Sequence, residues 1–299
     1  MRGEPLVHAL PPARVLQDRL EECVYLPGEI ARCPARSPLE ALTPEQLDLA
    51  LEQGDQRVGR TVFRPECPAC NACEPVRIDM DAFRPTRAQR RTWVRNEGVV
   101  RVELGTPELT RRRVSLWNRH RRERGLLRET SRRDPVGYED WLVRSCAPTV
   151  EVRYLLGERL VAVSLLDLGR TSANSAYHYF DPEHARLGLG VYSVMKEMEL
   201  CRSLGMRWYY LGLWVGGCSA LRYKTGYHPH ERHVRPLDAE PSAGASWVRV
   251  ETPPEGPEDV AEPASPSESG AVPGGDPSRL RSGGDSRGVP ATPRSAGSA

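Results

Sequence analysis

Lysine is almost missing from this chain of 299 residues, which holds only two, Lys196 and Lys224. The remaining basic residues are arginines, whose planar guanidinium groups present forked donors that suit phosphate. A general bias against lysine also raises the number of arginines everywhere in the chain. Only local clustering of arginines therefore indicates a binding surface.

Long apolar runs are absent as well. No stretch approaches the roughly 20 apolar residues that a membrane-spanning helix needs, and the chain does not open with the pattern of a signal peptide. We therefore expect a soluble, cytoplasmic protein with no membrane partner. In such a protein the eight cysteines, three of them clustered, fit reduced thiols or metal ligands better than a disulfide scaffold.

The last 49 residues, 251–299, have almost no large apolar side chains, and 25 of them are Pro, Gly or Ser. Such a segment cannot bury enough surface to offset its ordering entropy, so we expect a disordered tail. The net charge of the tail is −4 and that of the whole chain is +2, so residues 1–250 carry +6.

Two regions are expected before the tail: a cysteine- and arginine-rich region at residues 14–98 and a second region at 99–250. Capping signals and apolar spacing predict helices at 43–52, 106–124, 138–144 and 190–204. Alternating or continuous apolar runs predict strands at 61–64, 76–80, 150–156, 159–168, 175–180 and 208–214. The fold class is therefore α/β, or α+β.

Three cysteines at spacing three, Cys67, Cys70 and Cys73, form the most distinctive motif. Thiolates at this spacing can converge on one ion or cluster, and the pattern suits iron–sulfur ligation and, less often, zinc. Cys23 is the best candidate for a fourth ligand. The alternative is a tight loop of thiols that binds nothing. We expect ordinary buried thiols at the other four cysteines, which are Cys33, Cys146, Cys201 and Cys218.

Arginines follow the cysteine motif directly, at Arg84, Arg87, Arg90 and Arg91. Such a cluster is suited to the backbone of a nucleic acid. A second group lies in the predicted helix at 106–124 and includes Arg111, Arg112, Arg113, Arg119, Arg121, Arg122 and Arg124. For this second group, a solvated helix face explains the pattern as well as nucleic-acid binding does.

A predicted strand, a turn and a helix start follow one another before Gly190. Gly188 and Gly190 allow backbone N–H groups to approach an anion at the helix N-terminus, and Arg186 adds a positive side chain. The loop is similar to the Arg/Gln-x-x-Gly-x-Gly/Ala loop of acyltransferases with the Gcn5-related N-acetyltransferase fold, although its arginine is one place out of register. A plain helix start is the alternative. Further on, Lys224 is surrounded by aromatic residues, which is unusual for a surface lysine.

Together these motifs resemble those of the bacterial aspartate/glutamate leucyltransferases, relatives of the eukaryotic arginyl-tRNA–protein transferases. The matching segments occur in order between residues 20 and 237: Cys23–Gly28, Phe63–Arg77, Phe83–Arg91, Tyr179–Pro182, Leu187–Tyr192 and Tyr210–Lys224. The resemblance implies transfer of an aminoacyl group from charged tRNA to the N-terminal amine of a protein that begins with Asp or Glu. That protein is thereby marked for N-degron proteolysis. The resemblance also implies a C-terminal half with the Gcn5-related fold.

The cysteine pattern departs from that of the eukaryotic members. They place a Cys-x-x-Cys near the N-terminus, where this chain has only Cys23, and their later pair is adjacent rather than spaced. The resemblance therefore does not carry an iron–sulfur site over to this chain, and an iron–sulfur cluster or zinc stays an expectation from Cys23, Cys67, Cys70 and Cys73 alone. By resemblance alone, the Leu-Pro-Gly form at residues 26–28 implies leucine rather than arginine as the transferred residue.

The implied reaction needs little from the protein. An aminoacyl ester is already activated, and an α-amine with a pKa of about 8 is partly neutral at working pH, so no cofactor is required for the chemistry. The enzyme has to position the amine and stabilise the oxyanion. We expect the tRNA 3′ end over residues 186–190, with Asp181 or Tyr179 orienting the amine. Tyr223 and Lys224 are expected to face the acyl group or the acidic acceptor.

Three other functions stay open at this point. An arginyl-tRNA–protein transferase would use the same acceptors with a different donor. An acyl-CoA-dependent N-acyltransferase is less consistent with the offset phosphate loop and the arginine clusters. A non-enzymatic, metal-bearing RNA-binding module would not need the long α/β second half with its strand, loop and helix.

Overall fold

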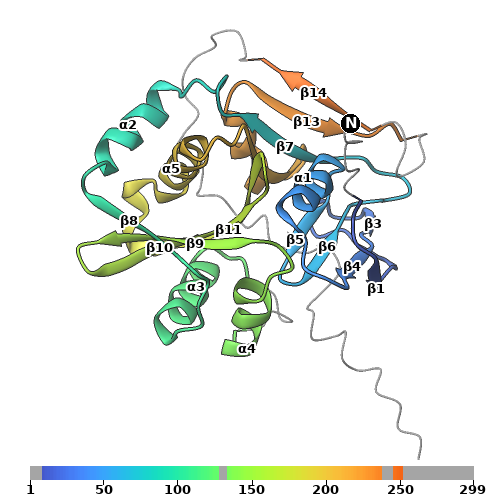
Figure 1. Cartoon of the computed structure of the whole chain (residues 1–299), viewed down its shortest axis with the longest axis horizontal. Coiled ribbons are helices and arrows are strands. Elements are labelled where there is room, and N and C mark those ends of the chain that lie inside the picture. The colour runs from blue at the N-terminus through green and yellow to red at the C-terminus, as the bar shows by residue number, and fades with distance from the viewer. Residues whose placement is uncertain (1–8, 128–132, 238–244, 252–299) are drawn as a thin grey trace, which may run out of the picture.

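The computed structural model describes residues 9–127, 133–237 and 245–251 (Figure 1). The disordered tail expected at 251–299 lies, apart from its first residue, outside these ranges. The largest element is a mixed sheet of eight strands in the order β14-β13-β7-β12-β11-β10-β9-β8. Its strands are β7 (Cys73–Asp79), β8 (Val100–Gly105), β9 (Thr149–Leu156), β10 (Arg159–Leu168), β11 (Ser172–Phe180), β12 (Trp208–Val215), β13 (His230–Val234) and β14 (Ser246–Val250). The predicted α/β class is confirmed.

The N-terminal part of the chain forms a smaller sheet beside the large one (Figure 1). Its strands, in spatial order, are β1 (Ala13–Gln17), β4 (Ala35–Pro38), β6 (Thr61–Phe63) and β5 (Gln56–Val58). A separate pair is formed by β2 (Leu20–Glu22) and β3 (Ile30–Arg32). Arg57 of β5 and Asp167 of β10 form an ion pair with a 2.6 Å Nε–Oδ2 distance, and both side chains are buried. This pair fastens the small sheet to the large one.

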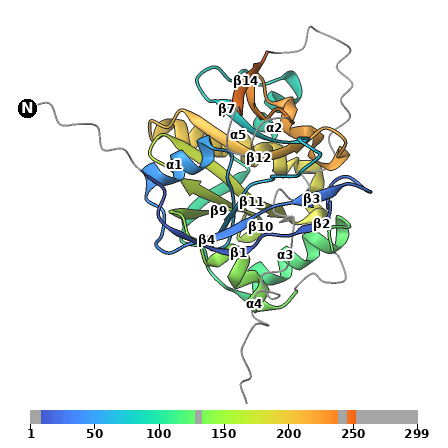
Figure 2. The same ribbon diagram turned by 90° about the vertical axis from the view of Figure 1, so that its right-hand side faces the viewer.

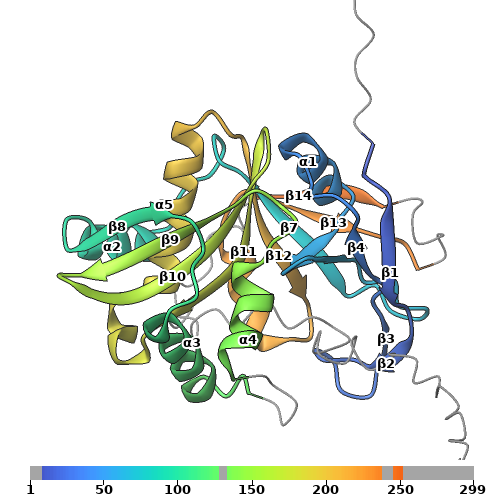
Figure 3. The same ribbon diagram turned by 60° about the horizontal axis from the view of Figure 1, so that its bottom comes forward.

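Helices cover both faces of the large sheet (Figure 3). On one face α2 (Arg87–Asn96) and α5 (Leu189–Ser203) lie side by side, and on the other α3 (Arg111–Glu123) and α4 (Pro135–Tyr138) pack together. The alternation of side chains along β11 separates two hydrophobic cores, because Phe180 packs under α5 whereas Tyr179 packs under α3 and α4. In Figure 2, α1 (Pro44–Glu52) lies at the left-hand side of the molecule, above β9.

The strands β11 and β12 are parallel, and they are paired only where Ser172–Asn174 meet Trp208–Tyr210. Beyond this short ladder the two strands diverge, as the fan of strands in Figure 3 shows. Gly212 adopts a positive φ of 75° at the shift in register between β12 and β7. A left-handed backbone of this kind favours glycine, since a side chain would be strained there. The bulge lets β12 leave β11 while it stays paired with β7.

Local capping signals account for most of the predicted helices. Thr43 caps α1, as the sequence predicts, and it forms a reciprocal capping box with Gln46. The helix predicted from residue 106 begins later, at Arg111, because the Thr110 hydroxyl accepts the hydrogen bond from Arg113 N and so caps the helix there. The helix predicted at 138–144 is instead the end of α4 followed by a π-helical turn at Glu139–Val143.

Two differences concern the region at residues 14–98. The arginine run after Phe83 is a helix, α2, which begins with a capping box formed by Thr86 and Gln89 and which the sequence analysis did not identify. The strand predicted at 76–80 is longer, because β7 begins at Cys73, and it is hydrogen-bonded between β12 and β13 of the large sheet. The division into regions 14–98 and 99–250 stays a prediction.

Candidate functional site

The loops after β11 and β12 lie at one edge of the large sheet, because the carboxyl ends of parallel strands point the same way. Asp181 and the 3-10 helix η2 (Pro182–Leu187) follow β11, and the 3-10 helix η3 (Ser219–Gly226) follows β12. Cys73, the last cysteine of the motif, pairs with Val215 at the end of β12. The cysteine motif and the segment around Lys224 therefore meet at the end of β12, and Asp181 lies at the same end of the neighbouring strand β11. We call this end of the sheet the carboxyl edge.

Asp181 is almost fully buried and is held by two guanidinium groups from other elements. Arg119 of α3 lies 3.1 Å from its carboxylate and Arg159 of β10 lies 2.8 Å from it. The backbone N–H of Glu183 donates to the same carboxylate at 3.3 Å. Desolvation alone would raise the pKa of Asp181, but the hydrogen bonds from Arg159, the Glu183 N–H and Arg119 outweigh it and lower the pKa. Asp181 is thus a fixed carboxylate that stays charged.

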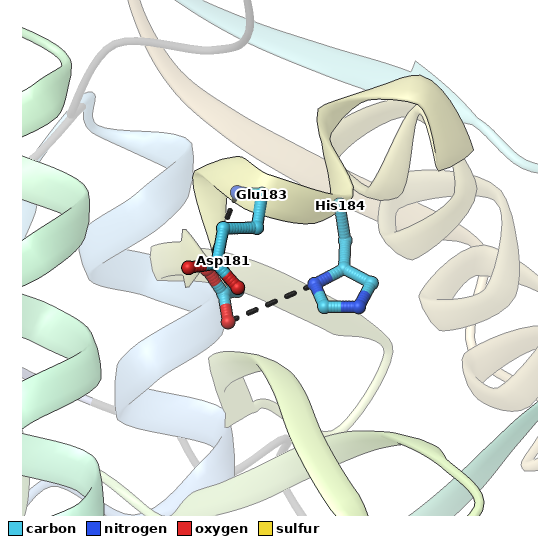
Figure 4. Close-up of side chains that lie close together, drawn as sticks. All are labelled: Asp181, Glu183 and His184. Atoms are coloured by element: carbon cyan, nitrogen blue, oxygen red, sulfur yellow. Dashed lines mark hydrogen bonds and ion pairs between the residues drawn. The ribbon is translucent and has the colours of Figure 1, made fainter.

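Figure 4 shows Asp181 next to Glu183 and His184 at the start of η2. Their ligand atoms lie within 4.8 Å of one another, the spacing of a cation site. However, Arg159 also pairs with Glu183 at 2.7 Å, and Arg119 approaches the same carboxylate at 3.4 Å. Two arginines already neutralise the two carboxylates, so this group is an ion-pair network.

Tyr179 does not share this position. Its side chain is fully buried on the face covered by α3 and α4, and its hydroxyl shares a 2.7 Å hydrogen bond with that of Tyr138. Burial raises the pKa of Tyr179 well above its usual value. Tyr223, by contrast, packs against the core on the α5 side. The structure therefore places the two tyrosines of the predicted site on opposite faces of the sheet.

Lys224 is fully buried in η3 and donates a hydrogen bond of 2.8 Å to the carbonyl oxygen of Leu213. It forms no salt bridge with any residue that the structure describes. Burial lowers its pKa to about 7, because a charged amine loses its hydration there. The ring of Tyr223 lies 6.0 Å from the Lys224 ammonium. Lys224 is thus a buried amine beside the ring of Tyr223, without a carboxylate partner among the described residues.

The loop at residues 186–190 and the arginine helix α2 are in direct contact. Gly188 takes a left-handed conformation with a φ of 63° and caps α5. Arg95 of α2 donates to the carbonyl oxygen of Arg186 at 2.7 Å, and Asn96 donates to that of Leu187, also at 2.7 Å. The predicted phosphate loop, including Gly190 in the first turn of α5, thus adjoins the predicted tRNA-binding arginines.

The arginines of α2 and of the segment before it are displayed to solvent. Arg84, Arg87, Arg90 and Arg91 are all exposed. None of them forms a salt bridge with a carboxylate in the part of the chain that the structure describes; Arg84 and Arg90 donate only to nearby backbone carbonyls. Their charge is therefore available to an external anion.

The four predicted metal ligands, Cys23, Cys67, Cys70 and Cys73, line one cavity of about 460 Å³. Arg235, which follows β13, holds the motif in place by donating to the carbonyl oxygens of Cys67 and Cys70 at 3.2 and 3.3 Å. A hydrogen bond from the Cys33 thiol lowers the pKa of Cys67 to about 6, whereas burial raises that of Cys73. Thiols from distant parts of the chain thus gather at this cavity.

The donor set fits a soft metal, but the sulfur positions do not match a single zinc ion. A tetrahedral zinc with bonds of about 2.3 Å brings its sulfurs to within about 4 Å of one another. Within residues 9–127, 133–237 and 245–251 the one group of donors gathered within 4.8 Å is Asp181, Glu183 and His184, so the cysteines are spread more widely.

Several residues of the site were not identified from the sequence. Arg159, which holds Asp181, lies in a strand and carries no motif. Cys33 and Cys218 were expected to be ordinary buried thiols, yet Cys33 contacts Cys67, and Cys218 interacts electrostatically with both Cys73 and Lys224. The capping pattern of α2 was the one signal that the sequence offered for the helical ladder of arginines.

Comparison with known proteins agrees with this arrangement. The chain matches the family models described as "Arginine-tRNA-protein transferase, N terminus" over residues 21–91 and "Arginine-tRNA-protein transferase, C terminus" over residues 112–234. The structure has no helix, within the residues it describes, that is long and apolar enough to span a membrane.

Among curated proteins the chain is similar to the aspartate/glutamate leucyltransferase of Chromobacterium violaceum, with 32% identity over 69% of this chain and 85% of the relative. The enzymes of the same name from Thiobacillus denitrificans and Halorhodospira halophila are 31% and 32% identical, over 70% and 73% of this chain and 86% and 92% of the relatives. Among solved structures it is similar to L-PGS from Bacillus licheniformis, with a TM-score of 0.39, 14% identity and coverage of 58% of this chain and 51% of that chain.

Proposed function

The chain belongs to the arginine-tRNA-protein transferase family, and we propose that it transfers leucine from leucyl-tRNA to the N-terminal amine of cytoplasmic proteins that begin with Asp or Glu. The observation that carries the proposal is that the arginine helix α2 contacts both the phosphate loop, through Arg95 and the carbonyl oxygen of Arg186, and the end of η3, the element that contains the buried Lys224, through Gln89 and the carbonyl oxygen of Gly226. A donor that is a polyanion and an acceptor that is acidic both require positive groups at one place.

The reaction forms one bond and breaks one. The acceptor α-amine attacks the ester carbonyl of the leucyl group, a C–N bond forms, and the ester C–O bond breaks. The amine gives up a proton and the tRNA 3′ hydroxyl leaves with one. Since the ester is activated, the protein acts mainly by positioning the reactants and stabilising the oxyanion.

We place the tRNA 3′ end at the N-terminus of α5, where Arg186 presents a positive side chain and Gly190 a backbone N–H group. The N–H of Gly188 is already donated to the carbonyl oxygen of Ala185 at 2.9 Å, so Gly188 contributes its left-handed turn and not a donor. The first N–H groups of a helix lack intrahelical partners, so they can bind a phosphate or the oxyanion. Asp181 is the better candidate for orienting the acceptor amine, because its carboxylate is fixed by Arg119 and Arg159 at the carboxyl edge and can accept a hydrogen bond from the neutral, attacking form of the amine. Tyr179 would reach the amine only if its buried hydrogen bond to Tyr138 were broken.

We place the acidic side chain of the acceptor near Lys224 and Tyr223. The buried amine has no internal carboxylate partner in the described part of the chain, so an acceptor carboxylate would supply one. That carboxylate would also restore the charged form of Lys224, since an adjacent negative charge raises the pKa of an amine. The discrimination between Asp or Glu and neutral N-terminal residues would then arise from this one contact.

A transfer assay tests the donor and the acceptor together. The protein is incubated with radiolabelled leucyl-tRNA and with peptides that differ only in a first residue of Asp, Glu or Ala. Label should enter the Asp and Glu peptides and not the Ala peptide. Repeating the assay with arginyl-tRNA identifies the donor, and acetyl-CoA in place of tRNA tests an acyl-CoA-dependent reaction. Absence of transfer from every charged tRNA would overturn the proposal.

Two variants test the placement of the acceptor. Asp181→Asn keeps the size of the side chain but removes its charge, and Lys224→Met keeps its length. Both should lower transfer at least tenfold, and the second should raise KM for the peptide more than it lowers kcat. Thermal denaturation monitored by circular dichroism checks that both variants fold. If both variants kept the wild-type rate, the carboxyl edge would not be the acceptor site.

A metal centre is not needed for this reaction. If one is present, Cys23, Cys67, Cys70 and Cys73 would hold it, and it would order the loop next to η3. Absorption between 300 and 500 nm after anaerobic purification, with iron and zinc analysis of the same sample, tests for it.

A further inference from the structure

An apolar groove runs between α2 and α5, and of the residues that line it only Arg90 has been assigned a role so far. Its volume is about 380 Å³. Met80, Met195 and Met198 form its floor and are at most 8% exposed. The partly buried rings of Phe83 and Trp93 form its walls. Methionine side chains adapt to the shape of a ligand, and aromatic rings offer flat surfaces for stacking.

The groove opens to solvent along α2. Val94, on its rim, is 76% exposed although it is a large apolar side chain. Two arginines, Arg90 and Arg202, also lie on the rim and are exposed. The one acidic residue that lines the groove, Glu199, is paired with Lys196 at 2.6 Å. The surroundings of this apolar groove are therefore positively charged, which suits a ligand with a flat apolar part and negative groups beside it.

A ladder of exposed arginines runs along α2 beside the groove, which Arg90 of the same helix lines, toward the phosphate loop. Arg87, Arg91 and Arg95 are spaced by four residues, so they lie on one side of the helix about 6 Å apart. This step is of the order of the distance between successive phosphates in a nucleic-acid strand. Arg95, the last of the ladder, donates to the carbonyl oxygen of Arg186. A nucleic-acid strand bound along these arginines therefore leads to the N-terminus of α5.

The groove is too far from that N-terminus to hold the reacting group itself. Met198 follows Gly190 by eight residues, which corresponds to about 12 Å along the helix axis. A leucyl ester at the phosphate loop does not span this distance, whereas a nucleotide one or two positions upstream does. Stacking of unpaired bases on aromatic side chains next to arginines is how proteins bind single-stranded nucleic acid.

We propose that the groove between α2 and α5 binds an unpaired base from the single-stranded 3′ end of the tRNA, while Arg87, Arg91 and Arg95 bind its phosphates. The identity of the RNA rests on the proposed function; the groove and its charge do not. The base anchors the strand, so that the terminal aminoacylated nucleotide reaches the phosphate loop in one register.

The test compares two RNA hairpins that carry the same acceptor stem, one with a single-stranded CCA 3′ end and one blunt. Fluorescence anisotropy measures the affinity of each. Val94→Glu places a negative charge at the mouth of the groove on an exposed position, so the fold should not change. Val99→Glu is the matched control, because Val99 is also exposed, at 52%, but does not line the groove. Circular dichroism checks that both variants fold.

Val94→Glu should weaken binding of the tailed hairpin about tenfold and leave the blunt hairpin unchanged, and Val99→Glu should change neither. Equal losses for both hairpins, or no loss for either, would overturn the proposal. The affinity measurement needs no transfer, so it is independent of the proposed function. Loss of tail binding in a protein that transfers no aminoacyl group would support the groove and reject the function.

Discussion

The helices α2 and α3 are both rich in arginine, yet they use their charge in opposite ways. The arginines of α2 are exposed and meet no carboxylate in the described residues. On α3, Arg113 is buried against Glu151, Arg121 stacks on Trp117 at 4.1 Å, and Arg119 holds Asp181. Three of the basic residues of α3 are thus bound within the protein. An arginine cluster indicates a binding surface only where the fold supplies no partner for it.

Among the arginines of α3, replacing Arg113 should cause the largest loss in the free energy of unfolding. Glu151 is fully buried, and its carboxylate accepts hydrogen bonds from Arg113 at 2.6 and 2.9 Å. Arg113→Ala takes away its closest cation, and breaking such a pair costs about 3–5 kcal/mol in the free energy of unfolding. Urea denaturation measures this loss. Arg111 is the exposed first residue of the same helix. Arg111→Ala should therefore change the free energy of unfolding by less than about 0.5 kcal/mol. If the two variants lost the same free energy of unfolding, the buried Arg113 would not differ from the exposed Arg111 in its contribution to stability.

On α2 the corresponding change should affect binding rather than folding. Replacing Arg87 and Arg91 together by Gln should weaken tRNA binding about tenfold or more near 0.15 M salt. The slope of log K against log salt should become smaller by roughly 1.5, because each phosphate contact contributes about 0.7–0.9. The same double replacement of the exposed Arg111 and Arg122 on α3 is the control. If the α3 replacements weakened tRNA binding as much as the α2 replacements, both helices would bind tRNA. The proposed difference between α2 and α3 would then be wrong.

A smaller effect concerns the histidine of α3. His120 is fully buried, and burial lowers its pKa to about 3. The unfolded chain takes up a proton at this residue below pH 6.5, whereas the folded protein does not until about pH 3, so stability is lost as pH falls through this window. His120→Gln should make the loss less steep, by at most about 1.4 kcal/mol per pH unit. Urea denaturation at pH 6.5, 5.5 and 4.5 measures the slope, and Arg111→Ala should retain the wild-type slope. An unchanged slope in His120→Gln would mean that His120 titrates normally.

Local signals in the sequence predicted the elements that depend on a few neighbouring residues. The capping signal at residue 43 sufficed for α1, and the apolar runs sufficed for β9 and β10. The helix α2 was missed because its buried side chains include Gln89, Thr92 and Asn96, which leave no apolar stripe to recognise.

Features that join distant parts of the chain could not be predicted. The partners of Asp181 come from α3 and β10, and nothing in the spacing of Arg119 or Arg159 points to them. The companion thiol of Cys67 is Cys33, more than thirty residues earlier, and its place depends on the small sheet. Candidate site residues could be proposed from the sequence where a motif is contiguous, whereas partners that the fold brings together from distant segments could not.

The position of β7 has a consequence for how the protein is made. This strand, Cys73–Asp79, is hydrogen-bonded to β12 on one side and to β13 on the other, and both neighbours are synthesised more than a hundred residues later. While the chain emerges from the ribosome, both edges of this early strand stay open until residues 208–234 arrive. Unpaired strands of this kind associate with other chains. Truncated products that end before β12 should therefore be aggregation-prone, and the nascent chain is a natural client for a chaperone.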